Sequence, residues 1–183
     1  MGGMIAQEIA ISFPEARALA DLDHVDDRQS QAAAAVPRGH GAMLMAPPPK
    51  TTEDEYLERF AETWKFLRVG AFPGGRGARR RARRCATFER GLNPAGVGRQ
   101  LRAVLASGSR KPRLHAVKAP TLVIHGTVDP LVRPEGGKDT AASIPGAKLL
   151  MIDGMGHALP IPMWPQIIDA IDQHAHGAAA KVA

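Results

Sequence analysis

The sequence is poor in cysteine and in aromatic residues, and it has no long apolar run. Cys85 is the only cysteine among 183 residues, so the chain can form neither an internal disulfide nor a metal site built from several cysteines. No stretch approaches the ~20 apolar residues of a membrane-spanning helix. The first residues lack the basic segment and cleavage site of a secretory signal, and Ala6 stands where a myristoylation signal requires Ser or Thr. We therefore expect a cytoplasmic protein with no membrane contact and one domain's worth of chain.

Positive charge is in excess, with a formal net charge of +6. Much of it lies in the run RGARRRARR, residues 76–84. No aromatic residues alternate with these arginines to stack on bases, and no known nucleic-acid module surrounds them. We expect a solvated helix face here. A non-catalytic fragment that binds nucleic acid stays an alternative, which salt-dependent DNA retention lost on neutralising Arg79 to Arg84 would support.

The order of elements expected after residue 119 indicates an α/β fold. Two short apolar runs, TLVIHG (121–126) and KLLMIDG (148–154), are typical of buried parallel strands. A helix is expected after each strand, so that strands and helices alternate. Apolar spacing, caps and breakers predict helices over 2–13, 51–69, 93–108, 135–144 and 162–175.

Two polar loops follow the two expected strands. Asp129 lies three residues beyond Gly126, and His157 directly follows Gly156. Ligands of parallel sheets bind at the carboxyl ends of the strands, so both side chains should face one crevice. A carboxylate that orients an imidazole fixes its tautomer and stabilises the imidazolium that forms when the ring takes a proton. A single Asp or His in a loop would be expected to face solvent and to have no catalytic role, but the two together predict a catalytic acid and base.

Three segments resemble the α/β-hydrolase superfamily. APTLVIHGTVDPLV (119–132) and IPGAKLLMIDGMGHALP (144–160) look like its acid-bearing and histidine-bearing segments, so the resemblance assigns the acid to Asp129 and the base to His157. MGGMIAQ (1–7) looks like the residues that directly follow the serine of the G-x-S-x-G elbow. On this match the backbone N–H of Met1 belongs to the oxyanion hole. The nucleophilic serine itself is then absent, and Ser12, Ser30, Ser107, Ser109 and Ser143 have no elbow context.

Residues 1–15 and most of 43–176 resemble the serine esterase-like branch that includes aclacinomycin methylesterase. The resemblance implies an N-terminally truncated α/β-hydrolase fold with a helical cap, which hydrolyses a small carboxylic ester without metal or organic cofactor. As given, the chain is expected to be inactive because its nucleophile is missing. A proline-iminopeptidase-like hydrolase is the nearest alternative. The expected parts are a post-elbow helix and irregular segment (1–45), the cap (46–115), the part with the acid and histidine (116–176) and a tail (177–183).

The segment ALADLDHVDDRQ (18–29) departs from the family pattern. Relatives are expected to carry a strand of the type R-S-L-T-S-I-M-S-T-T-G here. Synonymous codons for residues 18–29, read one nucleotide later, encode that strand, so we hypothesise a reading-frame slip over residues 17–39. Its carboxylates are costly to bury unpaired, and we expect loop or poor order. A metal cluster is the weaker interpretation, and His174 and His176 are expected to face solvent. The metal candidates are Asp21, Asp23, His24, Asp26 and Asp27.

Overall fold

A computed structural model describes residues 2–14, 20–23, 52–68, 70, 89–91 and 94–179. Within these ranges three parallel strands form a small sheet in the order β1-β2-β3. They are β1 (Ala20–Asp23), β2 (Thr121–Gly126) and β3 (Lys148–Ile152). The central strand β2 is buried along its whole length, as its unbroken apolar run predicts. The described chain alternates strands with helices after residue 120, which confirms the α/β class.

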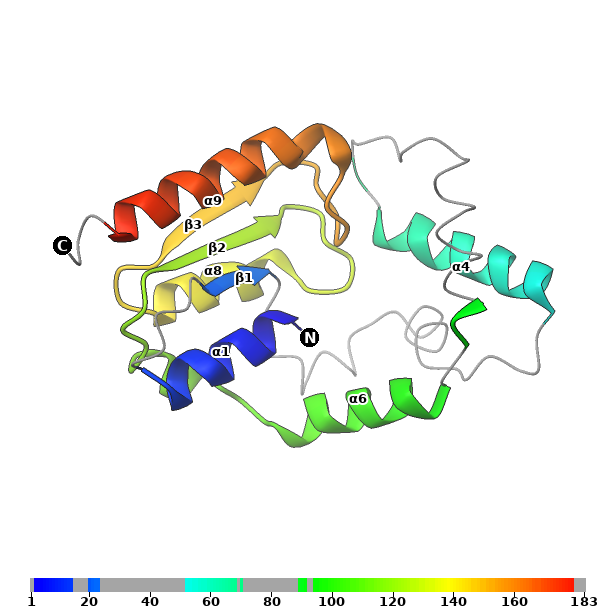
Figure 1. The fold of residues 1–183 in the computed structure, drawn as a ribbon, viewed down its shortest axis with the longest axis horizontal. Helices are drawn as coiled ribbons and strands as arrows, with labels where there is room; N and C mark the ends of the chain where they lie inside the picture. The colour runs from blue at the N-terminus through cyan, green and yellow to red at the C-terminus, as the bar shows by residue number, and fades with distance from the viewer. Residues whose placement is uncertain are drawn as a thin grey trace.

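Helices cover both faces of this sheet (Figure 1). On one face α1 (Gly2–Ser12), α7 (Lys111–Leu114) and α8 (Pro134–Ser143) surround a core that includes Ala10, Leu114 and Val123. On the other face α9 (Trp164–Ala179), which follows a 3₁₀ turn at Ile161–Met163, packs Ile167 against Ile124. Neighbouring residues of β2 therefore point into opposite cores, as the alternation of side chains along a strand requires.

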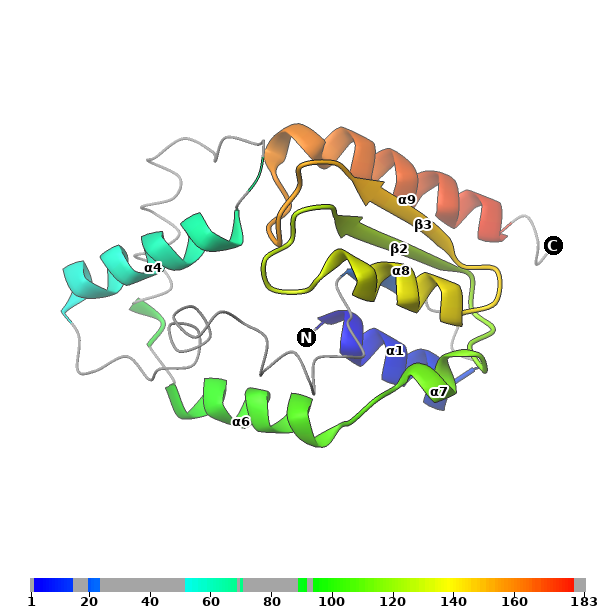
Figure 2. The same ribbon diagram turned by 180° about the vertical axis from the view of Figure 1, so that it is seen from behind.

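Two further helices lie beyond the carboxyl ends of the strands, away from the sheet (Figures 1 and 2). They are α4 (Glu53–Leu67) and α6 (Pro94–Ala106), both within the region expected to form a cap. A capping box begins α4: the Glu55 backbone N–H donates to Thr52 Oγ1 at 3.4 Å, and Thr52 N–H donates to the Glu55 carboxylate at 3.1 Å. Tyr56, Phe60 and Trp64 follow one another along the same face of this helix.

Strand β1 corrects one expectation. Loop was expected over residues 18–29, but Ala20–Asp23 form a strand that pairs parallel to Thr121–Ile124 of β2. Strand pairing joins backbone groups, so the edge of β2 can be paired by a segment whose sequence does not favour a strand. The rest of that segment, with His24, Asp26 and Asp27, lies outside the described residues, as do Ser30 and the arginine run.

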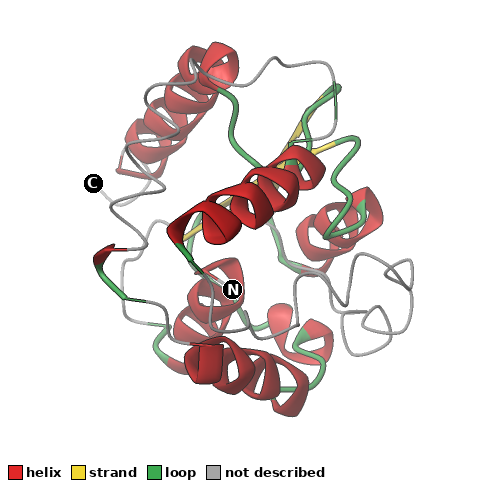
Figure 3. Cartoon of the chain, turned by 90° about the vertical axis from the view of Figure 1, so that its right-hand side faces the viewer, coloured by secondary structure: helices red, strands yellow, loops and turns green. Residues whose placement is uncertain are grey.

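Helix ends agree with the sequence to within a few residues. The short helix α7 was not predicted, because KPRL is too short to show a helical period. Helices dominate the described chain, and the short strands lie among them (Figure 3). None of the described helices combines the length and apolar character needed to span a bilayer.

Candidate active site

Asp129 and His157 lie together at the carboxyl edge of the sheet. Gly126, the last residue of β2, is in register with Ile152, the last residue of β3, so the loops that follow them start side by side. His157 Nδ1 is 2.9 Å from Asp129 Oδ2. The Asp129 side chain is fully buried, whereas 28% of the His157 side chain is exposed. The acid is thus enclosed by protein while the imidazole reaches the surface.

The carboxylate of Asp129 is held by the turn that it starts. Its Oδ1 atom accepts hydrogen bonds from the backbone N–H groups of Leu131 at 2.8 Å and Val132 at 2.9 Å. Three donors therefore converge on one buried carboxylate, an arrangement that favours its ionised form. An ionised carboxylate can only accept, so the proton between the two side chains belongs to His157 Nδ1. The Nε2 atom of His157 is then the ring nitrogen able to accept a proton.

The loops that carry the acid and the histidine are joined to each other. Thr127 Oγ1 donates to Asp153 Oδ1 at 3.0 Å and accepts from Gly154 N–H at 2.9 Å. The backbone N–H of Val128 donates to the Met155 carbonyl at 3.1 Å. These bonds join the two loops, so they help to hold Asp129 and His157 in their relative position.

Gly126 permits this close approach. A Cβ atom at Gly126 would lie 2.0 Å from the Met155 carbonyl oxygen, and this carbonyl belongs to backbone that cannot yield cheaply. The glycine that closes TLVIHG is therefore needed for the second loop to cross the end of β2. From the sequence alone, this glycine is expected only to end a strand.

The carboxyl end of α4 contacts the histidine loop. The Leu67 carbonyl accepts hydrogen bonds from the backbone N–H groups of His157 at 2.9 Å and Ala158 at 3.1 Å. These bonds satisfy one of the carbonyls that a helix leaves unpaired at its end. Gly70, with φ +130°, lies so close to Gly154 that a Cβ atom would be 2.0 Å from the Gly154 carbonyl oxygen. The expected cap therefore touches the backbone of the catalytic candidate itself.

The amino-terminal end of α1 points toward the same edge of the sheet, while its carboxyl end lies at the opposite edge (Figures 1 and 2). Met1, the expected oxyanion-hole donor, lies outside the described residues. Ser12, Ser107, Ser109 and Ser143 are described. Hydrogen bonds to helix carbonyls hold Ser107, on Val104, and Ser143, on Asp139.

The other histidine and metal expectations have mixed outcomes. No group of three or more His, Cys, Asp or Glu side chains in the described ranges could hold a metal ion. His176 is exposed, as expected, but His174 is 6% exposed, so the expectation that it faces solvent is wrong. His174 lies seven residues, about two helical turns, after the buried Ile167 and therefore shares the face of α9 that packs on the sheet.

Sequence reasoning missed a buried polar cluster between α1 and α7. Arg110 is 2% exposed, and its Nε donates to Gln7 Oε1 at 2.8 Å. Its Nη1 donates to Ser107 Oγ at 3.0 Å and to the Gly108 carbonyl at 3.3 Å. The guanidinium thereby ties α1 to the segment between α6 and α7. Only the structure shows this, because the two partners are 103 positions apart in the chain.

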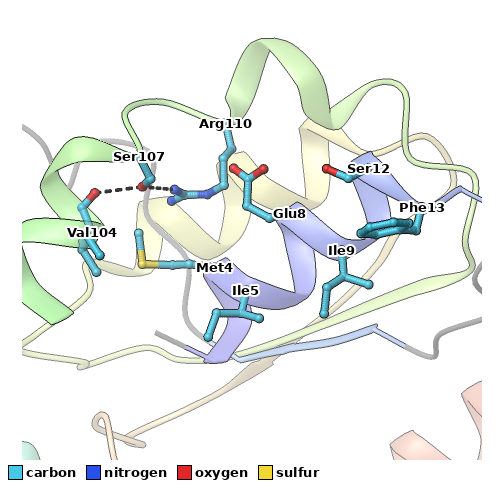
Figure 4. A pocket seen from close by; sticks show the side chains of 10 residues that line it. Met4, Ile5, Glu8, Ile9, Ser12, Phe13, Val104, Ser107 and Arg110 are labelled. Atoms are coloured by element: carbon cyan, nitrogen blue, oxygen red, sulfur yellow. Dashed lines mark hydrogen bonds between the residues drawn. The ribbon is translucent and has the colours of Figure 1, made fainter.

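Arg110 also lines a mainly apolar groove of about 340 Å³ along α1 (Figure 4). Ile5, Ile9 and Phe13 lie along the α1 side of this groove. Its ten lining residues include none from the loops that carry Asp129 and His157. The groove is therefore separate from the catalytic candidates.

The chain is similar in sequence to known hydrolases. A family model described as TAP-like protein, of the Abhydrolase_4 type, matches residues 98–172. The chain is 32% identical over 136 residues to the rhodomycin D methylesterase DnrP of Streptomyces peucetius, a match that covers 74% of this chain and 45% of that protein. The corresponding enzyme DauP of Streptomyces sp. (strain C5) is 29% identical over the same length. The chain thus spans about half the length of the curated relatives that it matches.

Solved structures share the arrangement of helices and strands. The enol-lactonase of Burkholderia xenovorans LB400 superposes with a TM-score of 0.59 at 16% identity, over 96% of this chain and 63% of that one. At this identity the likeness concerns the fold alone. The small parallel sheet and the helices on both of its faces agree with a partial version of that fold.

Proposed function

Because the chain belongs to the α/β-hydrolase superfamily and to its esterase-like branch, we propose that it is the carboxy-terminal part of a carboxylic ester hydrolase in which Asp129 and His157 are the acid and base of a Ser-His-Asp triad. The observation that carries the proposal is the 2.9 Å contact between His157 Nδ1 and a fully buried Asp129 carboxylate. A histidine held in this way is a general base whose Nε2 atom can take the proton of an attacking hydroxyl.

The mechanism follows from the two protonation states of the imidazole. His157 Nε2 takes the proton of the serine as its oxygen attacks the ester carbonyl, and Asp129 stabilises the imidazolium that results. His157 then gives this proton to the leaving alcohol. A water molecule, deprotonated by the same nitrogen, hydrolyses the acyl-enzyme, and His157 passes this proton to the departing serine oxygen. Each half-reaction returns His157 to its neutral form, so no external proton acceptor is consumed.

The serine of this proposal is not among the 183 residues. It belongs to a segment that directly precedes Met1 in the intact protein, with the Met1 backbone N–H in the oxyanion hole. The amino-terminal end of α1 at the carboxyl edge of the sheet supports this placement, because a helix amino terminus there favours negative charge on the substrate oxygen. Alone, the chain is expected to show no triad-dependent turnover.

Ester turnover tests the proposal in two steps. The 183-residue chain should hydrolyse p-nitrophenyl acetate no faster than its His157→Ala variant does. A fusion that places the strand and G-x-S elbow of a related esterase directly before Met1 should gain hydrolysis. That gain should be lost on His157→Ala or on replacing the added serine by alanine, and kept on His176→Ala, a matched change of an exposed histidine.

Two results would overturn the proposal. Robust hydrolysis by the unextended chain that depends on His157 would show that no additional serine is needed. Equal activity of the fusion with and without His157 would remove the histidine from the mechanism. Methyl esters are the first substrates to compare, since the curated relatives are methylesterases. Preference for proline p-nitroanilide over every ester would replace the esterase by the aminopeptidase alternative.

A further inference from the structure

Strand β2 carries a second histidine that the proposed mechanism does not use. The His125 side chain is 0% exposed, and its Nε2 atom lies 3.1 Å from the Val132 carbonyl oxygen. A carbonyl oxygen can only accept, so Nε2 carries a proton and donates it to Val132. The same nitrogen is 3.9 Å from Asp129 Oδ2, and this carboxylate is buried too. The ring therefore lies beneath the acid, inside the protein.

His125 is joined to His157 through a continuous series of hydrogen bonds. Its Nε2–H group holds the carbonyl of Val132, whose own N–H holds Asp129 Oδ1 at 2.9 Å. The other oxygen of Asp129 accepts from His157 Nδ1. His125 thus holds the carbonyl end of Val132, and the N–H groups of the same turn hold the Asp129 carboxylate. If the Val132 carbonyl lost this donor inside the protein, an unsatisfied acceptor would cost free energy and the turn would rearrange to satisfy it.

Helix α8 is shaped to leave room for this ring. A Cβ atom at Gly137 would lie 2.5 Å from His125 Nδ1 and 2.8 Å from its Cγ. These are ring atoms in a fully buried side chain, which cannot swing away as the end of an exposed chain could. A glycine within a helix is unfavourable by about 1 kcal/mol relative to alanine, and at Gly137 the contact with the His125 ring opposes that gain from alanine.

We propose that His125 is a positioning residue for the triad: its donated hydrogen bond holds the Asp129–Val132 turn in the geometry that orients His157. The proposal rests on the proposed function, because it assumes that Asp129 and His157 act as a pair. It goes beyond a core role for His125, because a histidine that merely filled space could be replaced by any side chain of similar volume.

The test observes the pair directly and needs no catalysis. In the 15N-labelled 183-residue chain, the proton on His157 Nδ1 should give a downfield resonance that disappears in both His157→Gln and Asp129→Asn. His125→Leu puts an apolar side chain of similar volume in place of the ring and removes the hydrogen-bond donor. The His157 Nδ1 proton should then exchange with water about tenfold faster, or its resonance should broaden beyond detection. His125→Gln, whose amide nitrogen can reach the Val132 carbonyl, should restore it.

A matched control separates positioning from general loss of stability. Val123→Ala removes buried volume from the same strand, two residues earlier, and should lower the melting temperature without changing the His157 resonance. Gly137→Ala provides a second route: its Cβ atom displaces the His125 ring without altering the ring itself, and it should have the effect of His125→Leu. This variant keeps the test decisive if His125→Leu does not fold.

The outcomes distinguish this proposal from the function on which it rests. An unchanged His157 resonance in folded His125→Leu or Gly137→Ala would overturn the positioning role and leave the Asp129–His157 pair intact. Failure of His125→Gln to restore the resonance would overturn it as well. A wild-type chain whose downfield resonance survives Asp129→Asn would instead contradict the pair, and with it the proposed function.

Discussion

Replacing Asp129 by asparagine should separate stability from catalysis. The variant keeps the shape of the side chain but removes its charge. Its amide oxygen can still accept the backbone N–H groups of Leu131 and Val132, which lie 2.8 and 2.9 Å from Oδ1 in the native protein. Its NH₂ group then faces His157 Nδ1, so that nitrogen must accept rather than donate. The proton moves to Nε2, the wrong tautomer for a general base.

Two opposing terms set the stability of this variant. It loses one charge-assisted hydrogen bond, worth about 1.5–3 kcal/mol. It also no longer buries an ionised carboxylate, which costs several kcal/mol before compensation. Because these two terms oppose each other, the net change in unfolding free energy should stay within about 2 kcal/mol. Asp129→Leu differs because it leaves the two backbone N–H groups without an acceptor at about 1–3 kcal/mol each, a loss of roughly 2–6 kcal/mol.

Urea unfolding of both variants, followed by circular dichroism, measures these terms. In the serine-supplied fusion, Asp129→Asn should reduce kcat about 10⁴-fold, the size of the effect of the corresponding substitution in a serine protease. Equal stability of the Asn and Leu variants would refute the reasoning, because it would mean that the Asp129 carboxylate does not hold the turn. Undiminished kcat in Asp129→Asn would refute the role of the carboxylate in setting the tautomer.

Three further predictions concern other parts of the chain. Tyr56 is the only tyrosine, and burial raises its pKa above the usual 10.0. Titration of the phenol, followed by absorbance at 295 nm, should therefore have its midpoint at a higher pH in the folded chain than in the urea-unfolded chain. The contribution of Tyr56 to stability is present below pH 10 and is lost as pH rises through the folded-state pKa. A double-mutant cycle with Gln7→Leu and Arg110→Met should give a coupling of about 1.5–3 kcal/mol in urea unfolding, and a value near zero would contradict the buried bond. Gly98→Ala, whose Cβ atom meets nothing within 4 Å, should raise the unfolding free energy by about 1 kcal/mol, whereas Gly137→Ala should lower it; the same sign for both would contradict the contact at α8.

The proximity of Asp129 and His157 could be predicted from the sequence because it follows from local rules. A short apolar run closed by glycine predicts a parallel strand, and the carboxyl ends of adjacent parallel strands meet at one edge. Asp129 and His157 needed only these two rules to be placed together. The hydrogen bonds that hold these two residues could not be predicted. They come from backbone groups of Leu131, Val132 and Leu67, and a backbone group is the same whatever the residue type. The same limit applies to Arg110 and Gln7, whose contact joins distant segments.

Residues 18–29, which depart most from the expected pattern, show that pairing with the edge of an existing strand can override the local preference of the sequence. The carboxylates of ADLD argued against a strand, yet Ala20–Asp23 pair with β2 in register. Side-chain burial decides whether such a strand is stable, but the hydrogen bonds that define it come from the backbone alone. The reading-frame hypothesis therefore makes a separate prediction about stability. Replacing residues 17–39 by the frame-shifted sequence, with Leu and Ile in the strand, should raise the unfolding free energy of the chain. A decrease would show that the acidic sequence is the native partner of this edge.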